Sequence, residues 1–219
     1  RGRDGQGTGQ EGVLNAAAHK VLVIACGAIA RELVRIRELN GWGHVEFQCL
    51  PAELHNRPEK IPAAVLEMIA ARRADYARLF VGYADCGTGG LLDQALQGTG
   101  VERIPGAHCY EFFAGSEEFH QLAGEEPGSF YLTDFLVRHF ERLVVRGLGL
   151  DREPALLPLY FGNYCRVVYL AQTEDAELQS LARRHAAFLG LDYLYRFCGD
   201  RPLSLALKPR LALEETCQS

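Results

Sequence analysis

Cysteines and histidines are spaced along this chain so that each follows a short apolar run. The residues are Cys26, Cys49, His55, Cys86, His108 and Cys109. Thiolate sulfur and imidazole nitrogen are the ligands that zinc prefers in proteins. A cysteine whose pKa is lowered by its neighbours can instead act as a nucleophile. These residue types therefore indicate a metal site or a reactive thiol, and the structural alternative is that they are buried cysteines acting as small hydrophobes.

The segment FVGYADCGTGGLLD, residues 80–93, runs from an apolar strand into an acid, a cysteine and three glycines. Glycines after a strand let backbone approach a ligand closely, and the helix that follows offers free N–H groups. We therefore predict that Gly87, Thr88, Gly89 and Gly90 bind a cofactor or an anionic group. The segment is neither a GxGxxG fingerprint nor a Walker loop, which disfavours a nucleotide. Packing of the helix against the strand is the alternative use of these glycines.

Two polar residues each directly precede a cysteine: Asp85 before Cys86, and His108 before Cys109. Either side chain could accept a proton or orient a ligating imidazole, so we predict catalytic roles for Asp85 and His108. The structural alternatives are a helix cap for Asp85 and a hydrogen bond to the backbone for His108.

Alternating strands and helices must position these residues. Apolar runs predict strands over 20–26, 44–50, 78–86 and 101–106, and helical spacing follows over 27–41, 63–77 and 90–100. In the second half the pattern predicts a long amphipathic helix within 129–151, a loop over 153–164, a strand from 165, a helix over 176–189 capped by Thr173, and a strand over 192–199. The predicted fold class is α/β: a three-layer, open, mostly parallel, Rossmann-like sheet, with two similar lobes as a variant of it.

The composition sets further bounds on the chain. We expect a disordered leader over 1–19, a single α/β domain over 20–207 with sub-lobes 20–125 and 126–207, and a tail over 208–219. A net charge of −5 argues against nucleic acid as a partner. No apolar run is long enough for a bilayer, and the start lacks the apolar core of a signal peptide, so we expect a cytoplasmic protein without membrane contact. Seven cysteines, an odd number, do not indicate a disulfide framework.

The expected sheet would bring distant residues together. In an open parallel sheet, ligands bind at the carboxyl ends of the strands, where the strand order reverses. We therefore predict that Cys26, Cys49, His55, Cys86 and Cys109 lie at one edge, with His108 beside Cys109, and that three or four of these ligands hold a metal. Zinc is the expected cofactor. An iron–sulfur cluster is the alternative, although the close CxxC pairs of ferredoxins are missing from the sequence.

Several segments together resemble the bacterial and archaeal family catalogued as domain of unknown function 1638. They are VIACGAIARE, LPAELHNRPEKIP, YADCGTGGLLD, GAHCYEFFAG, YLTDFLVRHFERLV and VYLAQTEDAELQSLA, and they span roughly residues 20–207. DCGTGG and HCYE are the most specific of these motifs. The family pattern falls on Cys26, His55, Cys86, His108 and Cys109. The resemblance sets Cys49 aside and leaves Cys26, His55, Cys86 and Cys109 as the implied metal ligands.

The resemblance implies corrinoid-linked one-carbon metabolism, since members of this family tend to be encoded beside corrinoid-dependent methyltransferase components. The implied function is a zinc-thiolate protein that transfers a methyl group to a thiol, with a small-molecule substrate from a thiol or methylated-amine pathway and a corrinoid protein or methyltransferase as partner. A corrinoid would be met only through that partner, because the DxHxxG signature is missing from the sequence. A non-catalytic accessory protein that carries a metal or ligand, and an enzyme with a cysteine nucleophile, remain alternatives.

Overall fold

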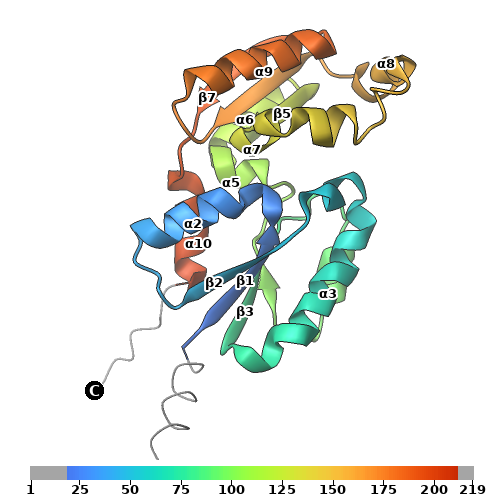
Figure 1. Ribbon diagram of the computed structural model, residues 1–219. Coiled ribbons are helices and arrows are strands. Elements are labelled where there is room, and N and C mark those ends of the chain that lie inside the picture. Colours follow the sequence, from blue (N-terminus) through green and yellow to red (C-terminus); the bar gives the residue numbers. More distant parts are fainter. Residues whose placement is uncertain (1–18, 212–219) are drawn as a thin grey trace, which may run out of the picture.

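Figure 1 shows the computed structural model of the protein, in which residues 19–211 are described. The described chain forms two sheets of parallel strands with helices packed on them, and each sheet is the centre of one lobe. The predicted α/β class, with open parallel strands and two lobes, is confirmed.

The first lobe contains the four strands that the apolar runs predict. They are β1 (Val21–Cys26), β2 (Val45–Leu50), β3 (Arg78–Gly82) and β4 (Glu102–Arg103). All six residues of β1 are buried, as expected for a central strand covered on both faces. The strand order is β2-β1-β3-β4, so the chain moves outward from β1 to β2 and then crosses to the other side of β1. The order therefore reverses at β1 and β3, whose carboxyl ends form the expected crevice.

Helices of the first lobe follow the strands in the expected alternation. They are α2 (Ala30–Leu39), α3 (Ile61–Arg72) and α4 (Leu91–Leu96), with short 3-10 turns at Gly27–Ile29, Ala52–Asn56, Pro58–Lys60 and Arg73–Asp75. On α2, Leu33 and Ile36 are fully buried and supply the apolar face that helical spacing predicts. The turn at Ala52–Asn56 directly follows β2 and places His55 at the carboxyl edge of the sheet.

The second lobe begins after two linking helices, α5 (Tyr110–Ala114) and α6 (Ser116–Glu125). Its sheet has the order β5-β6-β7, with β5 at Ser129–Thr133, β6 at Arg166–Ala171 and β7 at Asp192–Phe197. The remaining elements are α7 (Asp134–Arg138), a π-helical turn (Glu141–Val145), a 3-10 turn (Pro154–Leu156), α8 (Leu157–Phe161), α9 (Ala176–Leu189) and α10 (Arg201–Leu211). Alternate residues of β6 face different cores: Val168 and Leu170 pack with the first lobe's cluster, and Val167 and Tyr169 with that of the second lobe.

Several second-half predictions need correction. The long helix predicted within 129–151 is divided into α7 and the π-helical turn, and β5 precedes it. Thr133 caps α7 by accepting a hydrogen bond from the Leu136 N–H. The loop predicted over 153–164 contains α8. Asp175, and not Thr173, caps α9, because the Thr173 hydroxyl donates instead to the buried Asp134 carboxylate at 2.5 Å.

The last helix returns to the first lobe. Leu203, Leu207 and Leu211 of α10 are buried in the first lobe's core, and the imidazole Nε2 of His44 lies 2.8 Å from the carbonyl oxygen of Leu211. The helix thus continues past residue 207, where the sequence predicts the domain to end. It follows the predicted sub-lobe 126–207 in the chain, yet it packs in the core of the other sub-lobe. The leader that we expect to be disordered lies outside the described residues, except for His19, as does the tail beyond Leu211.

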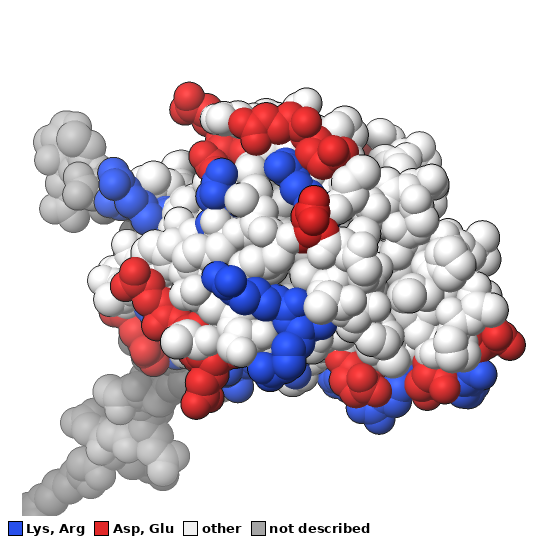
Figure 2. All heavy atoms as spheres, turned by 90° about the horizontal axis from the view of Figure 1, so that it is seen from above, with Lys and Arg blue, Asp and Glu red and all other residues white. Residues whose placement is uncertain are grey.

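The surface seen in Figure 2 carries charges of both signs. Acidic and basic side chains form short separate groups with uncharged side chains between them, so neither sign covers this face. Within residues 19–211, no helix is both long enough and apolar enough to cross a bilayer.

Candidate metal centre

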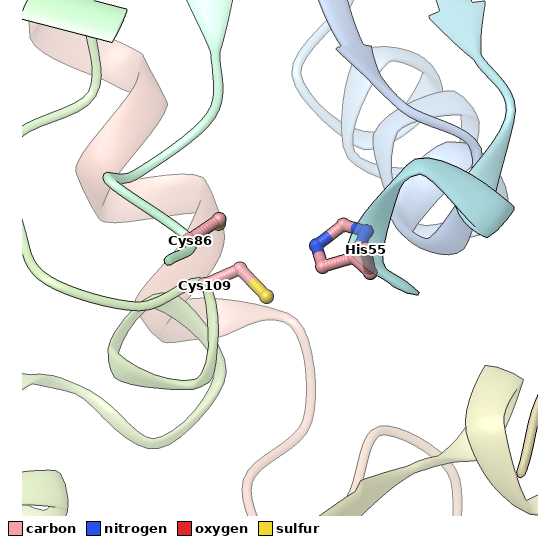
Figure 3. Close-up of side chains that lie close together, drawn as sticks. All are labelled: His55, Cys86 and Cys109. Carbon is pink, nitrogen blue, oxygen red and sulfur yellow. The ribbon is translucent and has the colours of Figure 1, made fainter. Parts of the chain in front are cut away.

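Three of the predicted ligands meet at the carboxyl edge of the first sheet. One ligand atom each of His55, Cys86 and Cys109 lies within 4.8 Å of the other two. Figure 3 shows His55 facing the two cysteines from the opposite side of the gap between them. The three residues come from segments that follow β2, β3 and β4 respectively. A group of one nitrogen and two sulfur ligands is a soft donor set suited to zinc.

Backbone pairing beyond the strands brings the two cysteines together. The short ladder between β3 and β4 ends early, yet the N–H of Asp85 donates to the carbonyl of Gly106 at 3.0 Å. The N–H of Cys86 likewise donates to the carbonyl of Ala107 at 3.0 Å. These two bonds join the loops that leave the strands, so Cys86 and Cys109 approach each other although they are far apart in sequence.

Cys86 occupies a strained backbone position. Its φ is +50°, and among the described residues it is the one non-glycine residue with a positive φ. The left-handed conformation costs an ordinary residue roughly 1–2 kcal/mol. The residue after it, Gly87, also has a positive φ, which allows the chain to turn sharply behind the thiol. Strain at a residue that presents a sulfur atom to a ligand group is typical of functional sites.

Asp85 holds the glycine turn. Its carboxylate accepts hydrogen bonds from the Thr88 hydroxyl at 2.7 Å, the Gly89 N–H at 3.0 Å and the Gly90 N–H at 2.8 Å. Burial by itself would raise the pKa of Asp85, but these hydrogen bonds lower it below the ordinary value. The structure therefore places Asp85 in the capping role. The Gly89 and Gly90 N–H groups, predicted to hold a cofactor, thus donate to the protein's own carboxylate, and the Thr88 N–H donates to the Asp85 backbone carbonyl.

Cys26 contacts the imidazole ring of His55. The imidazole Nδ1 lies 3.5 Å from the Cys26 sulfur and 3.3 Å from the carbonyl oxygen of Ala52. The Cys26 sulfur also accepts the N–H of Ala28 at 3.3 Å. Cys26 thus contacts the imidazole but is not one of the three residues whose ligand atoms lie within 4.8 Å of one another.

Charge separation is favoured within the group when no metal is bound. A hydrogen bond from Cys109 and the neighbouring His55 lower the pKa of Cys86 to about 4, against the effect of burial. Burial would lower the pKa of His55, but hydrogen bonds to Cys26 and Cys86 raise it to about 10. The pKa of the Cys109 thiol is raised by its hydrogen bond to Cys86 and by burial. The result at neutral pH is a Cys86 thiolate beside a His55 imidazolium.

His108 lies beside the group without joining it. Its Nδ1 accepts the Tyr110 N–H at 3.4 Å and is 3.6 Å from the Cys109 sulfur. The ring stacks on Tyr110 with centroids 4.0 Å apart. Burial lowers the pKa of His108 below its ordinary value, so this imidazole is neutral at pH 7.

A cavity of about 400 Å³ opens onto the ligand group. The first lobe contributes His55, Cys86, His108 and Cys109 to its lining. Across from them the second lobe supplies an apolar wall, which we define as Phe130, Phe135, Leu136, Leu143, Val144 and Leu148. The sequence reasoning missed this wall. Most of its residues lie on α7 and the π-helical turn with the spacing of any buried helix face, and Phe130 lies on β5. Such spacing does not indicate which surface the residues cover.

Comparison with known proteins gives one match. A family model described as "Protein of unknown function (DUF1638)" matches residues 49–203, a range that includes His55, Cys86 and Cys109 but not Cys26. No curated protein matches the chain, and no solved structure matches it.

Proposed function

Because the chain belongs to the family of proteins of unknown function DUF1638, the site itself must indicate the activity, and we propose that the protein binds zinc and activates a thiol for methyl transfer. The supporting observation is the group of His55, Cys86 and Cys109 in the lining of a cavity of about 400 Å³. Three protein ligands with access from a cavity are typical of catalytic zinc, whereas structural zinc is usually enclosed by four.

The donor set fits zinc in charge and in softness. When bound, the ion would lower the pKa of a substrate thiol, so that the sulfur is a nucleophilic thiolate near neutral pH. In the transfer, the sulfur–methyl bond forms while the bond between methyl and its donor breaks, and the electron pair of the broken bond stays with the donor.

The protein's own residues orient the group and take up the thiol proton. Cys26 holds Nδ1 of His55, which leaves Nε2 as the ring nitrogen available for a ligand bond. Neutral His108 lines the same cavity, and its Nδ1 can accept the proton of an entering thiol in exchange for the 3.4 Å hydrogen bond from the Tyr110 N–H. Asp85 acts indirectly, since it fixes the turn from which Cys86 projects.

Elemental analysis of protein purified without chelator tests the proposal. We expect about one zinc per chain in the parent protein, and loss of that zinc in Cys86→Ser and Cys109→Ser. The matched control is Cys165→Ser, whose cysteine is exposed and does not belong to the group. Parent protein without metal after anaerobic purification and zinc addition, or full zinc binding by both variants, would refute the proposal.

A second candidate function is supported by the lowered pKa of Cys86 beside His55. A thiolate next to an imidazolium is the arrangement of cysteine nucleophiles. The two candidates differ in their response to metal. A nucleophile would react with iodoacetamide at the same rate with or without zinc, whereas a zinc ligand would be protected when zinc is added.

The wider setting is also a proposal. We place the protein in the cytoplasm, with a corrinoid protein or methyltransferase as the methyl donor. The family resemblance supports this setting. Because the sequence lacks the DxHxxG corrinoid signature, we assign the corrinoid, and with it the methyl donor, to a partner protein. Methyl transfer from a methylated corrinoid protein to a thiol, measured with purified components, would test it.

A further inference from the structure

Apart from the group of His55, Cys86 and Cys109, the cavity lining has no charged side chain. Among the described residues that line it, none is Asp, Glu, Lys or Arg. Its polar side chains beyond the ligand group are Asn56, His108, Tyr110 and Thr133. Two of these are engaged with the protein: the Asn56 side-chain amide donates to the carbonyl of Leu143 at 3.3 Å, and Thr133 caps α7. A charged group entering the cavity would therefore find no partner of opposite charge.

The metal group itself adds no net charge. Two cysteine thiolates balance a divalent cation, and a ligating imidazole is neutral. The site consequently offers no attraction for the carboxylate, sulfonate, phosphate or ammonium group that many biological thiols carry, while their loss of water would cost free energy.

Aromatic and aliphatic side chains surround the remaining space. Phe113 and Tyr110 close the cavity from the first lobe, and the apolar wall faces them from the second. Apolar surface in this arrangement favours a ligand that buries hydrocarbon against it. The cavity volume of about 400 Å³ admits a small molecule and lies at the lower end of the range for ligand sites.

We propose that the substrate is a small thiol with an uncharged, apolar tail, such as an alkanethiol or arylalkanethiol. The sulfur would meet the group of His55, Cys86 and Cys109, and the hydrocarbon would lie against the apolar wall. This inference rests on the proposed function, because it assumes that a metal holds the substrate sulfur.

Three thiols of similar size test the inference: propanethiol, mercaptopropanoate and cysteamine. They are titrated into cobalt-loaded protein, whose visible spectrum reports a change of ligands at the metal, and their dissociation constants are measured by calorimetry. Propanethiol is expected to change the spectrum and to bind at least about tenfold more tightly than either charged thiol. Equal or tighter binding of a charged thiol would overturn the inference while leaving the metal site intact. Failure of cobalt and zinc to bind at all would instead refute the proposed function.

A charge introduced in the wall gives an independent readout. Leu136→Arg places a cation in the cavity lining, and Leu159→Arg is the matched control because Leu159 is 75% exposed on α8. We expect the Leu136 variant to gain affinity for mercaptopropanoate relative to propanethiol, and the control to keep the preference of the parent. An unchanged preference in a folded Leu136 variant would show that the tail does not lie against the wall. If that variant fails to fold, the comparison of thiols on the parent decides the matter.

Discussion

The imidazole Nδ1 of His55 lies 3.5 Å from the sulfur of Cys26, which closes the neighbouring strand β1. A residue predicted as a metal ligand thus contacts the imidazole of another predicted ligand, and in the proposed zinc site it would orient that ring. Partners of this kind fix the ring orientation and the tautomer of a ligating histidine. The two cysteine roles at this edge of the sheet, binding and orienting, can be separated by experiment.

Cys26→Ala should weaken zinc binding without abolishing it. Loss of a group that orients a ligand typically lowers metal affinity about 10–100-fold. Competition with a chromophoric chelator would measure this change, and Cys86→Ala should show a much larger loss in the same assay. A Cys26 variant that loses metal as completely as the Cys86 variant would make Cys26 a direct ligand.

Cys86→Gly should be more stable than Cys86→Ala by about 1 kcal/mol in metal-free protein, because glycine relieves the left-handed backbone strain. Urea denaturation measures the difference. Cys26 provides the matched control: its φ is −75°, so there the glycine variant should be the less stable of the two. The same order at both positions would show that strain at Cys86 does not account for the effect.

Gly147→Ala should disturb His55 from the second lobe. A Cβ at Gly147 would lie 2.8 Å from the Asn56 side-chain nitrogen and would also clash with the carbonyl oxygen of Leu143. Because Asn56 donates to that same carbonyl and is next to His55, we expect a loss of roughly 1–3 kcal/mol in stability and weaker zinc binding.

Thermal unfolding and zinc titration would measure both effects of the Gly147 change. Gly124→Ala on α6 is the control, since no atom lies within 4 Å of its added Cβ. That variant should keep the zinc affinity of the parent. Unchanged zinc affinity in the Gly147 variant would argue that the π-helical turn does not hold the His55 segment in place.

Glu32→Gln should change how stability depends on pH. Glu32 is only 4% exposed on α2, and burial raises its pKa above 4.5 despite the nearby Arg35, with Asp134 and Asp200 acting in the same direction as burial. The unfolded chain then releases its proton first, so the parent loses stability relative to the variant as pH rises above about 4.5. Denaturation at a series of pH values measures this, and a difference that stays constant from pH 3 to pH 8 would contradict it.

Most helices and strands were predicted from the sequence. Where a prediction was incomplete or wrong, contacts between residues distant in sequence decide the observed structure. The buried run of β1 and the helix over Ala176–Leu189 are confirmed, because hydrophobic spacing is a local property. The strand β5 was not predicted, since its residues also fit a helical pattern and pairing with β6 decides their conformation. The cap of α9 differs for a similar reason: Thr173 bonds to Asp134, which is distant in sequence.

Strands and the residues that follow them can be recognised locally, so the sequence was enough to predict that cysteine and histidine side chains gather at the carboxyl edge of a parallel sheet. The folded structure was needed to show that His55, Cys86 and Cys109 form the group and that Cys26 contacts His55. It also decided that Asp85 occupies the glycine turn and that the second lobe covers the site with an apolar wall. These outcomes depend on loop pairing and on packing between lobes, where a shift of a few ångströms separates a ligand from its neighbour.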